Sequence, residues 1–272
     1  MKVVLLAGGL GSRLAEETHI RPKPMVEIGG VPIIEHIMNW YMKFNYKEFI
    51  ICLGYKGDEI ISYFKDYHLK GSSVVISENG KIETINGYKK PWKISLVQTG
   101  ENTQTAGRIN RIRDYLKPNE TFFMTYGDGL SDININKLLE NHKKNKKLAT
   151  VTAVRPLARF GALDIKDSNV ESFTEKPINE VGWINGGFFV LSERALNFIN
   201  NDNEPWEIGP LNRLVKENQL AAYKHHGFWQ PMDTLREKLI LNNLWSNNKA
   251  PWKVESDNLS NLSTIRKFVS IK

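Results

Sequence analysis

Residues 2–14 read KVVLLAGGLGSRL, an apolar run that leads into a glycine-rich segment. The run from Lys2 to Ala7 is β-branched and apolar and stops at two glycines, which is typical of a buried strand that ends in a loop. Gly8, Gly9 and Gly11 carry no Cβ, so backbone N–H groups of this loop can approach an anion closely. The stretch therefore predicts a strand followed by an anion-binding loop.

Basic residues follow the glycines. Arg13 ends the loop, and Lys23 lies ten residues further on between Pro22 and Pro24, which stiffen that segment. Both cations are available to neutralise a polyphosphate. A Walker A loop would end in Gly-Lys-Ser/Thr, and a dinucleotide fingerprint would need a third glycine near Leu14; the chain has neither. We therefore interpret the segment as a phosphate-binding loop of another kind.

Strand-like and helix-like segments alternate along the first half of the chain. Strands are expected at 49–53, 73–77, 93–98, 121–126 and 148–154, and helices at 33–42, 58–67, 107–116 and 135–146. This spacing of βαβ units predicts an α/β fold with a doubly wound, mostly parallel, Rossmann-like sheet and helices on both faces. The pattern loosens after about residue 155, where we expect strands at 162–165, 170–173 and 187–191, then helices near 193–199, 206–217 and 233–246.

The composition is that of an ordinary globular protein, with 41% hydrophobic and 25% charged residues among 272. No apolar stretch reaches 18 residues, and the apolar start is too short for a secretory signal, so we expect a cytoplasmic protein without a membrane span. The net charge of +7 comes from basic residues interleaved with acidic ones, without the basic aromatic face of a nucleic-acid binder. The single cysteine, Cys52, lies in an apolar run and is expected in the core.

Two aspartates are candidate metal ligands. Asp128 follows the strand expected at 121–126 and should face the same crevice as the glycine loop, because open α/β sheets bind ligands beyond the carboxyl ends of their strands. Asp233 begins the last long helix, where the competing interpretation is a helix N-cap. Asp132 and Asp164 compete as carboxylates. Mg²⁺ bound to nucleotide phosphates takes one or two carboxylates, a need that Asp128 with Asp233 fits.

Further motifs follow in order along the chain. Residues 8–14 and 23–30 are followed by matching stretches at 126–129, 159–164, 175–177, 184–189 and 227–234. This ordered set resembles the signature of sugar-phosphate nucleotidylyltransferases over roughly residues 1–253. The resemblance implies one domain over 1–253, with a nucleotide-binding half at about 1–155, a smaller sugar-phosphate-binding half at about 156–253, and a C-terminal tail at 254–272.

The resemblance also implies an activity. A cytidylyl group would pass from CTP to α-D-glucose 1-phosphate, giving CDP-glucose and pyrophosphate, with Mg²⁺ as cofactor. The nucleophile would be a phosphate oxygen that is already ionised at pH 7, so the enzyme need only align two anions and stabilise charge on the phosphates. By the same resemblance we expect a homo-oligomer, a hexamer or a tetramer, that serves deoxysugar synthesis for surface polysaccharide such as O-antigen.

Residue roles follow from the matched motifs. On the nucleotide side the resemblance implies contacts from Leu6, Gly8, Gly9, Gly11, Ser12, Arg13, Lys23, Thr105, Gly107, Arg108, Gly127 and Asp128. On the sugar-phosphate side it implies Tyr126, Gly161, Glu175, Lys176, Asn185 and Gly186. Lys23 is assigned to the α-phosphate and Arg13 to the leaving pyrophosphate as catalytic cations, and Asp128 with Asp233 would hold the metal.

Three alternatives stay open at this point. The same fold could use another nucleoside triphosphate or another phosphorylated acceptor, although thymidylyl members usually have Lys-Gln where this chain has Lys23-Pro24. A non-catalytic sensor of nucleotides or sugar phosphates is the second alternative, but Arg13, Lys23, Asp128 and Asp233 are all present. A nucleic-acid-binding module is the third. Residues 207–210 stand where the family usually has a more acidic stretch, so the identity of the substrate is less determined than the type of reaction.

Overall fold

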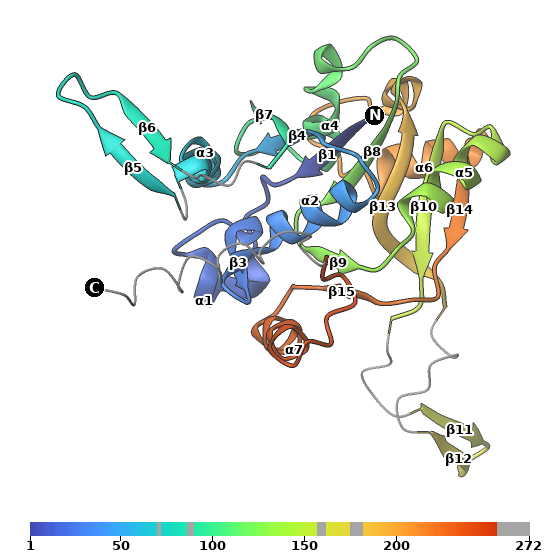
Figure 1. Cartoon of the computed structure of the whole chain (residues 1–272). Helices are drawn as coiled ribbons and strands as arrows, with labels where there is room; N and C mark the ends of the chain where they lie inside the picture. The colour runs from blue at the N-terminus through green and yellow to red at the C-terminus, as the bar shows by residue number, and fades with distance from the viewer. Residues whose placement is uncertain (70–71, 86–89, 157–161, 175–181, 255–272) are drawn as a thin grey trace.

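The computed structural model describes residues 1–69, 72–85, 90–156, 162–174 and 182–254, and its centre is a seven-stranded sheet (Figure 1). The strands are ordered β14-β10-β13-β8-β1-β4-β7. Their bounds are β1 (Lys2–Leu6), β4 (Glu48–Leu53), β7 (Lys93–Gln98), β8 (Thr121–Tyr126), β10 (Ala149–Val154), β13 (Ile184–Ser192) and β14 (Leu220–Lys224). Only β13 runs antiparallel to its neighbours within this sheet, so the predicted mostly parallel α/β sheet is confirmed.

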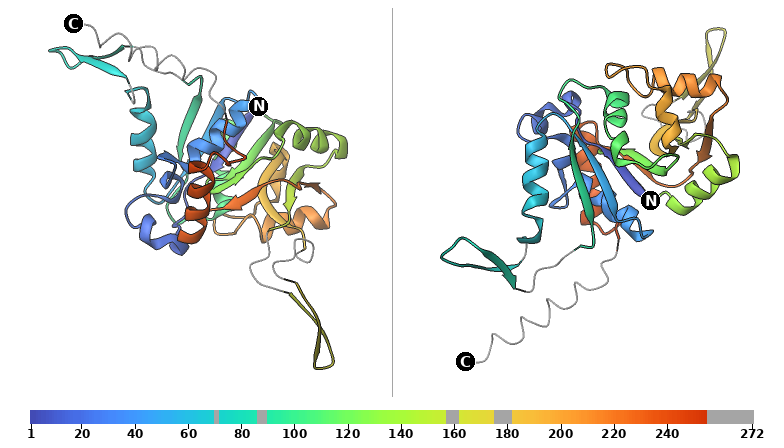
Figure 2. Two further views of the ribbon diagram at one scale, coloured as in Figure 1. Left: turned by 60° about the horizontal axis from the view of Figure 1, so that its bottom comes forward. Right: turned by 90° about the horizontal axis from the view of Figure 1, so that it is seen from above.

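Helices cover both faces of the sheet, as Figure 2 shows from two sides. One face carries α2 (Ile33–Lys43), α3 (Gly57–Lys65), α5 (Ile135–Asn145) and α7 (Leu235–Ser246). The other carries α4 (Thr105–Asn110), the 3₁₀ segment η5 (Glu193–Phe198) and α6 (Gly209–Lys216). Each face therefore has its own hydrophobic core, which is the layered arrangement of a doubly wound fold.

Side-chain alternation along each central strand divides the residues between these two cores. In β1, Val3 and Leu5 pack into the core under α2, whereas Val4 and Leu6 pack into the core under α4. Successive side chains of a strand point to opposite faces, so a strand buried on both sides is apolar at every position. Cys52 lies on the α4 face and is fully buried, as expected from the sequence.

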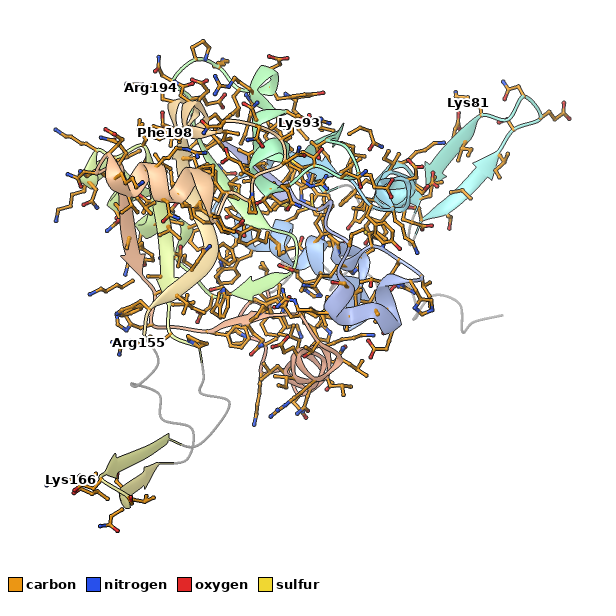
Figure 3. The ribbon with its side chains drawn as sticks, turned by 180° about the vertical axis from the view of Figure 1, so that it is seen from behind. Lys81, Lys93, Arg155, Lys166, Arg194 and Phe198 are labelled. Carbon is orange, nitrogen blue, oxygen red and sulfur yellow. The ribbon has the colours of Figure 1, made fainter. Side chains whose placement is uncertain are left out.

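Short elements surround the sheet. They are η1 (Ser12–Leu14), α1 (Ala15–Thr18), η2 (Lys23–Met25), β2 (Glu27–Ile28), β3 (Val31–Pro32), η3 (Tyr67–Leu69), η4 (Arg113–Tyr115), β9 (Gly129–Ser131) and β15 (Trp229–Pro231). Two hairpins, β5 (Ser73–Ile76) with β6 (Ile82–Ile85) and β11 (Ala162–Lys166) with β12 (Asn169–Thr174), stand apart from the sheet. Figure 3 marks them by Lys81 and Lys166, well away from Lys93 in the body.

Several elements differ from the expectation. The strand expected at 73–77 pairs with β6 instead of joining the main sheet. The helix expected at 107–116 begins at Thr105 and ends at Asn110, and a separate 3₁₀ turn follows at Arg113–Tyr115. The N-cap of α7 is Thr234, which forms a capping box with Glu237, so Asp233 lies just outside the helix. None of the described helices has the length and apolar character needed to cross a membrane.

Candidate active site

A cavity of about 460 Å³ opens at the carboxyl ends of β1 and β8. Its wall is formed by the loop from Leu6 to Arg13, by Lys23 and Pro24 of η2, by residues 101–105, and by Tyr126 to Asp128. This is the edge of a parallel sheet at which ligands of α/β proteins bind. The glycine loop and Asp128 therefore share one crevice, as the sequence predicted.

The glycine loop is shaped for a close approach. Gly11 has a φ of +65°, a left-handed conformation that side chains with a Cβ rarely adopt. A Cβ on Gly8 would lie 2.2 Å from the Arg108 guanidinium. Within the described chain, the backbone N–H groups from Gly8 to Gly11 donate to no protein acceptor. They are therefore available to a bound anion.

The Arg108 side chain holds the glycine loop in place through hydrogen bonds. Its guanidinium is buried and donates to the carbonyl oxygens of Leu53, Gly8, Gly100 and Glu101 and to the Thr99 hydroxyl. These acceptors lie at the ends of β1, β4 and β7, so one side chain ties three strand ends together. Arg108 lines the cavity, but both of its terminal nitrogens, Nη1 and Nη2, donate to protein acceptors.

Four charged side chains meet on one side of the cavity. Lys23 Nζ lies 2.6 Å from Asp128 Oδ2 and 2.6 Å from Asp233 Oδ1. Arg13 Nη1 lies 2.9 Å from Asp233 Oδ2, and its side chain is 72% exposed. The cluster thus pairs two cations with two carboxylates in charge-assisted contacts.

The two aspartates converge because two short strands pair. β9 and β15 lie side by side in antiparallel register, with Gly129 opposite Pro231 (Figure 1). Asp128 immediately precedes β9, and its carbonyl oxygen accepts from Met232 N at 2.9 Å. Asp233 follows Met232, so the register places the two carboxylates on the same cation.

The pKa of Lys23 responds to opposing influences. Burial alone lowers it, but the charges of Asp128 and Asp233 and their hydrogen bonds outweigh burial and hold the pKa above its ordinary value. Lys23 is only 8% exposed. The ammonium is therefore fully charged at neutral pH.

A second cavity, of about 320 Å³, adjoins the first. It is lined by Asn185, Gly186 and Gly187 of β13, by Glu207, and by Trp229 of β15. Trp229 Nε1 donates to the Gly186 carbonyl at 2.7 Å, which fixes the indole ring as part of the wall. The two cavities share Arg13, Tyr126 and Asp128, so ligands in both would meet beside the charged cluster.

The structure gathers most of the predicted site residues around these cavities. On the nucleotide side it brings to the first cavity Leu6, Gly8, Gly9, Gly11, Ser12, Arg13, Lys23, Thr105, Arg108, Gly127 and Asp128. Gly107 does not line it; a Cβ there would lie 2.6 Å from the Asp202 carbonyl, so the glycine permits close packing instead. On the sugar side, Tyr126, Asn185 and Gly186 line the second cavity, while Gly161, Glu175 and Lys176 lie outside the described residues.

Glu207 was not predicted as a site residue. Its carboxylate accepts a hydrogen bond from Tyr126 OH and another from Thr105 Oγ1 at 2.8 Å. A glutamate in a loop before a helix gives no local sign of such partners, because both lie more than 80 positions away along the chain.

Comparisons with known proteins agree with this geometry. Residues 2–234 match the nucleotidyl transferase family. The chain is 50% identical to the glucose-1-phosphate cytidylyltransferase of Salmonella typhimurium over 255 residues, covering 93% of this chain and 99% of that protein. It is 43% identical to the probable glucose-1-phosphate cytidylyltransferase of Bacillus subtilis over 256 residues, covering 93% and 100%.

Two solved structures are similar in fold. HddC from Yersinia pseudotuberculosis has a TM-score of 0.65 at 25% identity, covering 90% of this chain and 99% of that one. UDP-glucose pyrophosphorylase complexed with UDP-glucose has a TM-score of 0.63 at 17% identity, covering 91% and 98%, a likeness of fold alone. With the glycine loop, the charged cluster and the match over residues 2–234, the chain belongs to the nucleotidyl transferase family and is a nucleotidyltransferase.

Proposed function

We propose that the protein transfers a cytidylyl group from CTP to α-D-glucose 1-phosphate, giving CDP-glucose and pyrophosphate. One observation carries the proposal: two cavities adjoin each other at a cluster of two cations and two carboxylates. Transfer between two phosphorylated substrates needs such a junction. Relatives at 50% and 43% identity named for this activity support the choice of substrates.

The reaction needs alignment and charge stabilisation more than proton transfer. A phosphate oxygen of glucose 1-phosphate attacks the α-phosphorus of CTP, the bond to the β-phosphate breaks, and pyrophosphate leaves. Lys23, which lines the first cavity beside Asp128, would bind the α-phosphate, and the exposed Arg13 would bind the departing pyrophosphate. N–H groups of the Gly8–Gly11 loop supply further donors for phosphate oxygens.

The carboxylate pair suits Mg²⁺. Asp128 Oδ2 and Asp233 Oδ1 both lie 2.6 Å from one positive centre, the Lys23 ammonium, so oxygens of the kind that Mg²⁺ prefers already converge. No group of three or more His, Cys, Asp or Glu residues in the described parts of the chain could hold a metal alone. Asp128 and Asp233 would hold the ion together with substrate phosphates. When bound, it would neutralise phosphate charge in the transition state.

The cellular setting belongs to the same proposal. A cytoplasmic homo-oligomer, hexamer or tetramer, that supplies CDP-glucose for deoxysugars of surface polysaccharide is the expectation drawn from the sequence. Sedimentation velocity of the purified protein tests the oligomer, and a sedimentation coefficient of a monomer would contradict it. Loss of CDP-glucose from cells that lack the gene tests the pathway.

The activity is tested by pyrophosphate release. CTP, UTP, ATP, GTP and dTTP are each offered with glucose 1-phosphate, with Mg²⁺ or with EDTA. We expect release with CTP, abolished by EDTA, and CDP-glucose as the nucleotide sugar formed. Equal release with other nucleotides would overturn the choice of CTP, and no release with any sugar 1-phosphate would overturn catalysis in favour of a sensor.

A further inference from the structure

Glu207 lies between the two cavities. It follows Trp206, which is fully buried in the core under α4, and it precedes α6. The Glu207 side chain lines the second cavity, whereas one of its partners, Thr105, lines the first. The loop is thus anchored by a buried indole, and its carboxylate is held at the boundary of the two pockets.

The hydrogen bonds around Glu207 have a fixed direction. Trp206 N donates to Thr105 Oγ1 at 2.7 Å, and the Thr105 hydroxyl in turn donates to Glu207 Oε2 at 2.8 Å. Tyr126 OH donates to Glu207 Oε1. An ionised carboxylate only accepts hydrogen bonds, so both hydroxyl groups must act as donors toward Glu207.

The chain of bonds continues into the second cavity. Asn185 Oδ1 accepts from Gly187 N at 2.8 Å, which orients the amide, and Asn185 Nδ2 donates to the Tyr126 hydroxyl at 3.5 Å. The Tyr126 oxygen therefore accepts from Asn185 while its O–H donates to Glu207, and the second N–H of the Asn185 amide is left for a ligand.

We propose that Glu207 is a positioning residue that couples the nucleotide pocket to the sugar-phosphate pocket, an inference that rests on the proposed function. It does so by fixing which atoms Thr105, Tyr126 and Asn185 present to the two substrates. A nucleotide that orders Thr105 at the start of α4 thereby also orders Tyr126 and Asn185 for a sugar phosphate. By linkage, each substrate then strengthens the binding of the other by the same factor.

The test measures this coupling factor, the ratio by which one substrate strengthens the binding of the other. The dissociation constant of glucose 1-phosphate is determined by calorimetry, with and without saturating α,β-methylene-CTP, in which the bond that must break is not labile. We expect a factor of about fivefold or more in the wild-type protein, which is the usual range of coupling between sites. In Glu207→Gln an NH2 group replaces one of the two carboxylate oxygens, so Thr105 or Tyr126 loses its acceptor and the coupling factor should fall to about one.

Two further variants separate positioning from folding. Glu204 belongs to the same loop, accepts from Arg213 Nη2 at 2.6 Å and lines neither cavity, so Glu204→Gln should keep the wild-type factor. Tyr126→Phe keeps the ring but removes the hydroxyl that joins Glu207 to Asn185, and it should also lose the coupling factor. If Glu207→Gln does not fold, Tyr126→Phe alone decides the question.

The outcomes are distinct from those of the activity assay. Loss of coupling in Glu207→Gln and in Tyr126→Phe, with retention in Glu204→Gln, supports the inference; if Glu207→Gln does not fold, loss in Tyr126→Phe takes its place. An unchanged factor in Glu207→Gln, an equal loss in Glu204→Gln, or a wild-type factor of one overturns it. Failure of the proposed function shows itself separately, as absence of pyrophosphate release by the wild-type protein.

Discussion

Replacing Lys23 by alanine removes the ammonium that lies 2.6 Å from Asp128 and from Asp233. Breaking a buried ion pair by removing one partner costs about 3–5 kcal/mol. Asp128 is 29% exposed and Arg13 still pairs with Asp233, so we expect a loss of unfolding free energy nearer about 2 kcal/mol. Urea denaturation at pH 7 measures it.

The catalytic loss should be larger. Removal of one preorganised donor to a transition state costs about 10²–10³ in kcat, equivalent to roughly 2.7–4 kcal/mol. Lys2→Ala is the matched control, because Lys2 Nζ also forms a partly buried pair, 2.8 Å from Glu120, at the opposite end of the strands. Lys2→Ala should lose some stability and keep its kcat.

A metal titration without nucleotide gives an independent measurement. In Lys23→Ala the two carboxylates face no ammonium, so Mg²⁺ should stabilise this variant more than it stabilises the wild-type protein. At ten times its Kd the ion would add about 1.4 kcal/mol of stability, seen as a rise in Tm. Near-normal kcat in Lys23→Ala, or an equal rise in Tm for both proteins, would refute the assignment of Lys23 and the carboxylate pair.

Three other regions give predictions that need no substrate. In Arg108→Lys, an ammonium with three donors replaces a guanidinium that donates to five acceptors, and urea denaturation should show a loss of about 2–4 kcal/mol in unfolding free energy. The matched control is Arg111→Lys, at a partly exposed side chain, which should lose less than about 1 kcal/mol. Burial raises the pKa of the Cys52 thiol to about 12, so a thiol reagent should label it only after unfolding; rapid labelling of the folded protein would contradict its place in the core. Burial alone raises the pKa of Glu35, but the charge of Lys90 and hydrogen bonds outweigh it and hold the pKa below its ordinary value. The stability that Glu35 adds over Glu35→Gln should therefore be complete above its unfolded pKa of about 4.3 and should vanish as pH falls further; a difference independent of pH in acid denaturation would count against this pair.

The central strands were predictable because burial on both faces leaves an unbroken apolar run. Residues 3–6 and 49–53 pack into two cores at once, which no amphipathic helix of that length would do. Strand direction was not predictable in the same way. The apolar run at 187–191 has the same composition whether it runs parallel or, as β13 does, antiparallel, because direction depends on how the chain returns to the sheet.

The shape of the glycine loop was predictable because it depends on local backbone geometry. Gly11 needs its positive φ, and Gly8 needs space for Arg108, whatever the rest of the chain does. Arg108 itself shows the limit of such reasoning. Its position after a Thr-x-Gly pattern indicated a ligand contact, whereas the structure commits its guanidinium to strand ends that come from Leu53, Gly8 and Gly100.

The carboxylate pair and Glu207 depend on contacts that no local pattern contains. Asp128 and Asp233 meet because β9 and β15, three residues each, pair in one register, and a slip by one residue would turn their side chains to the other face. Glu207 reaches Thr105 and Tyr126 because Trp206 is locked into the core beside them. The pairing of two short strands thus brings Asp128 and Asp233 together, and one anchored loop brings Glu207 to Thr105 and Tyr126. Substitutions that shift the β9–β15 register should therefore abolish transfer while leaving most of the unfolding free energy intact.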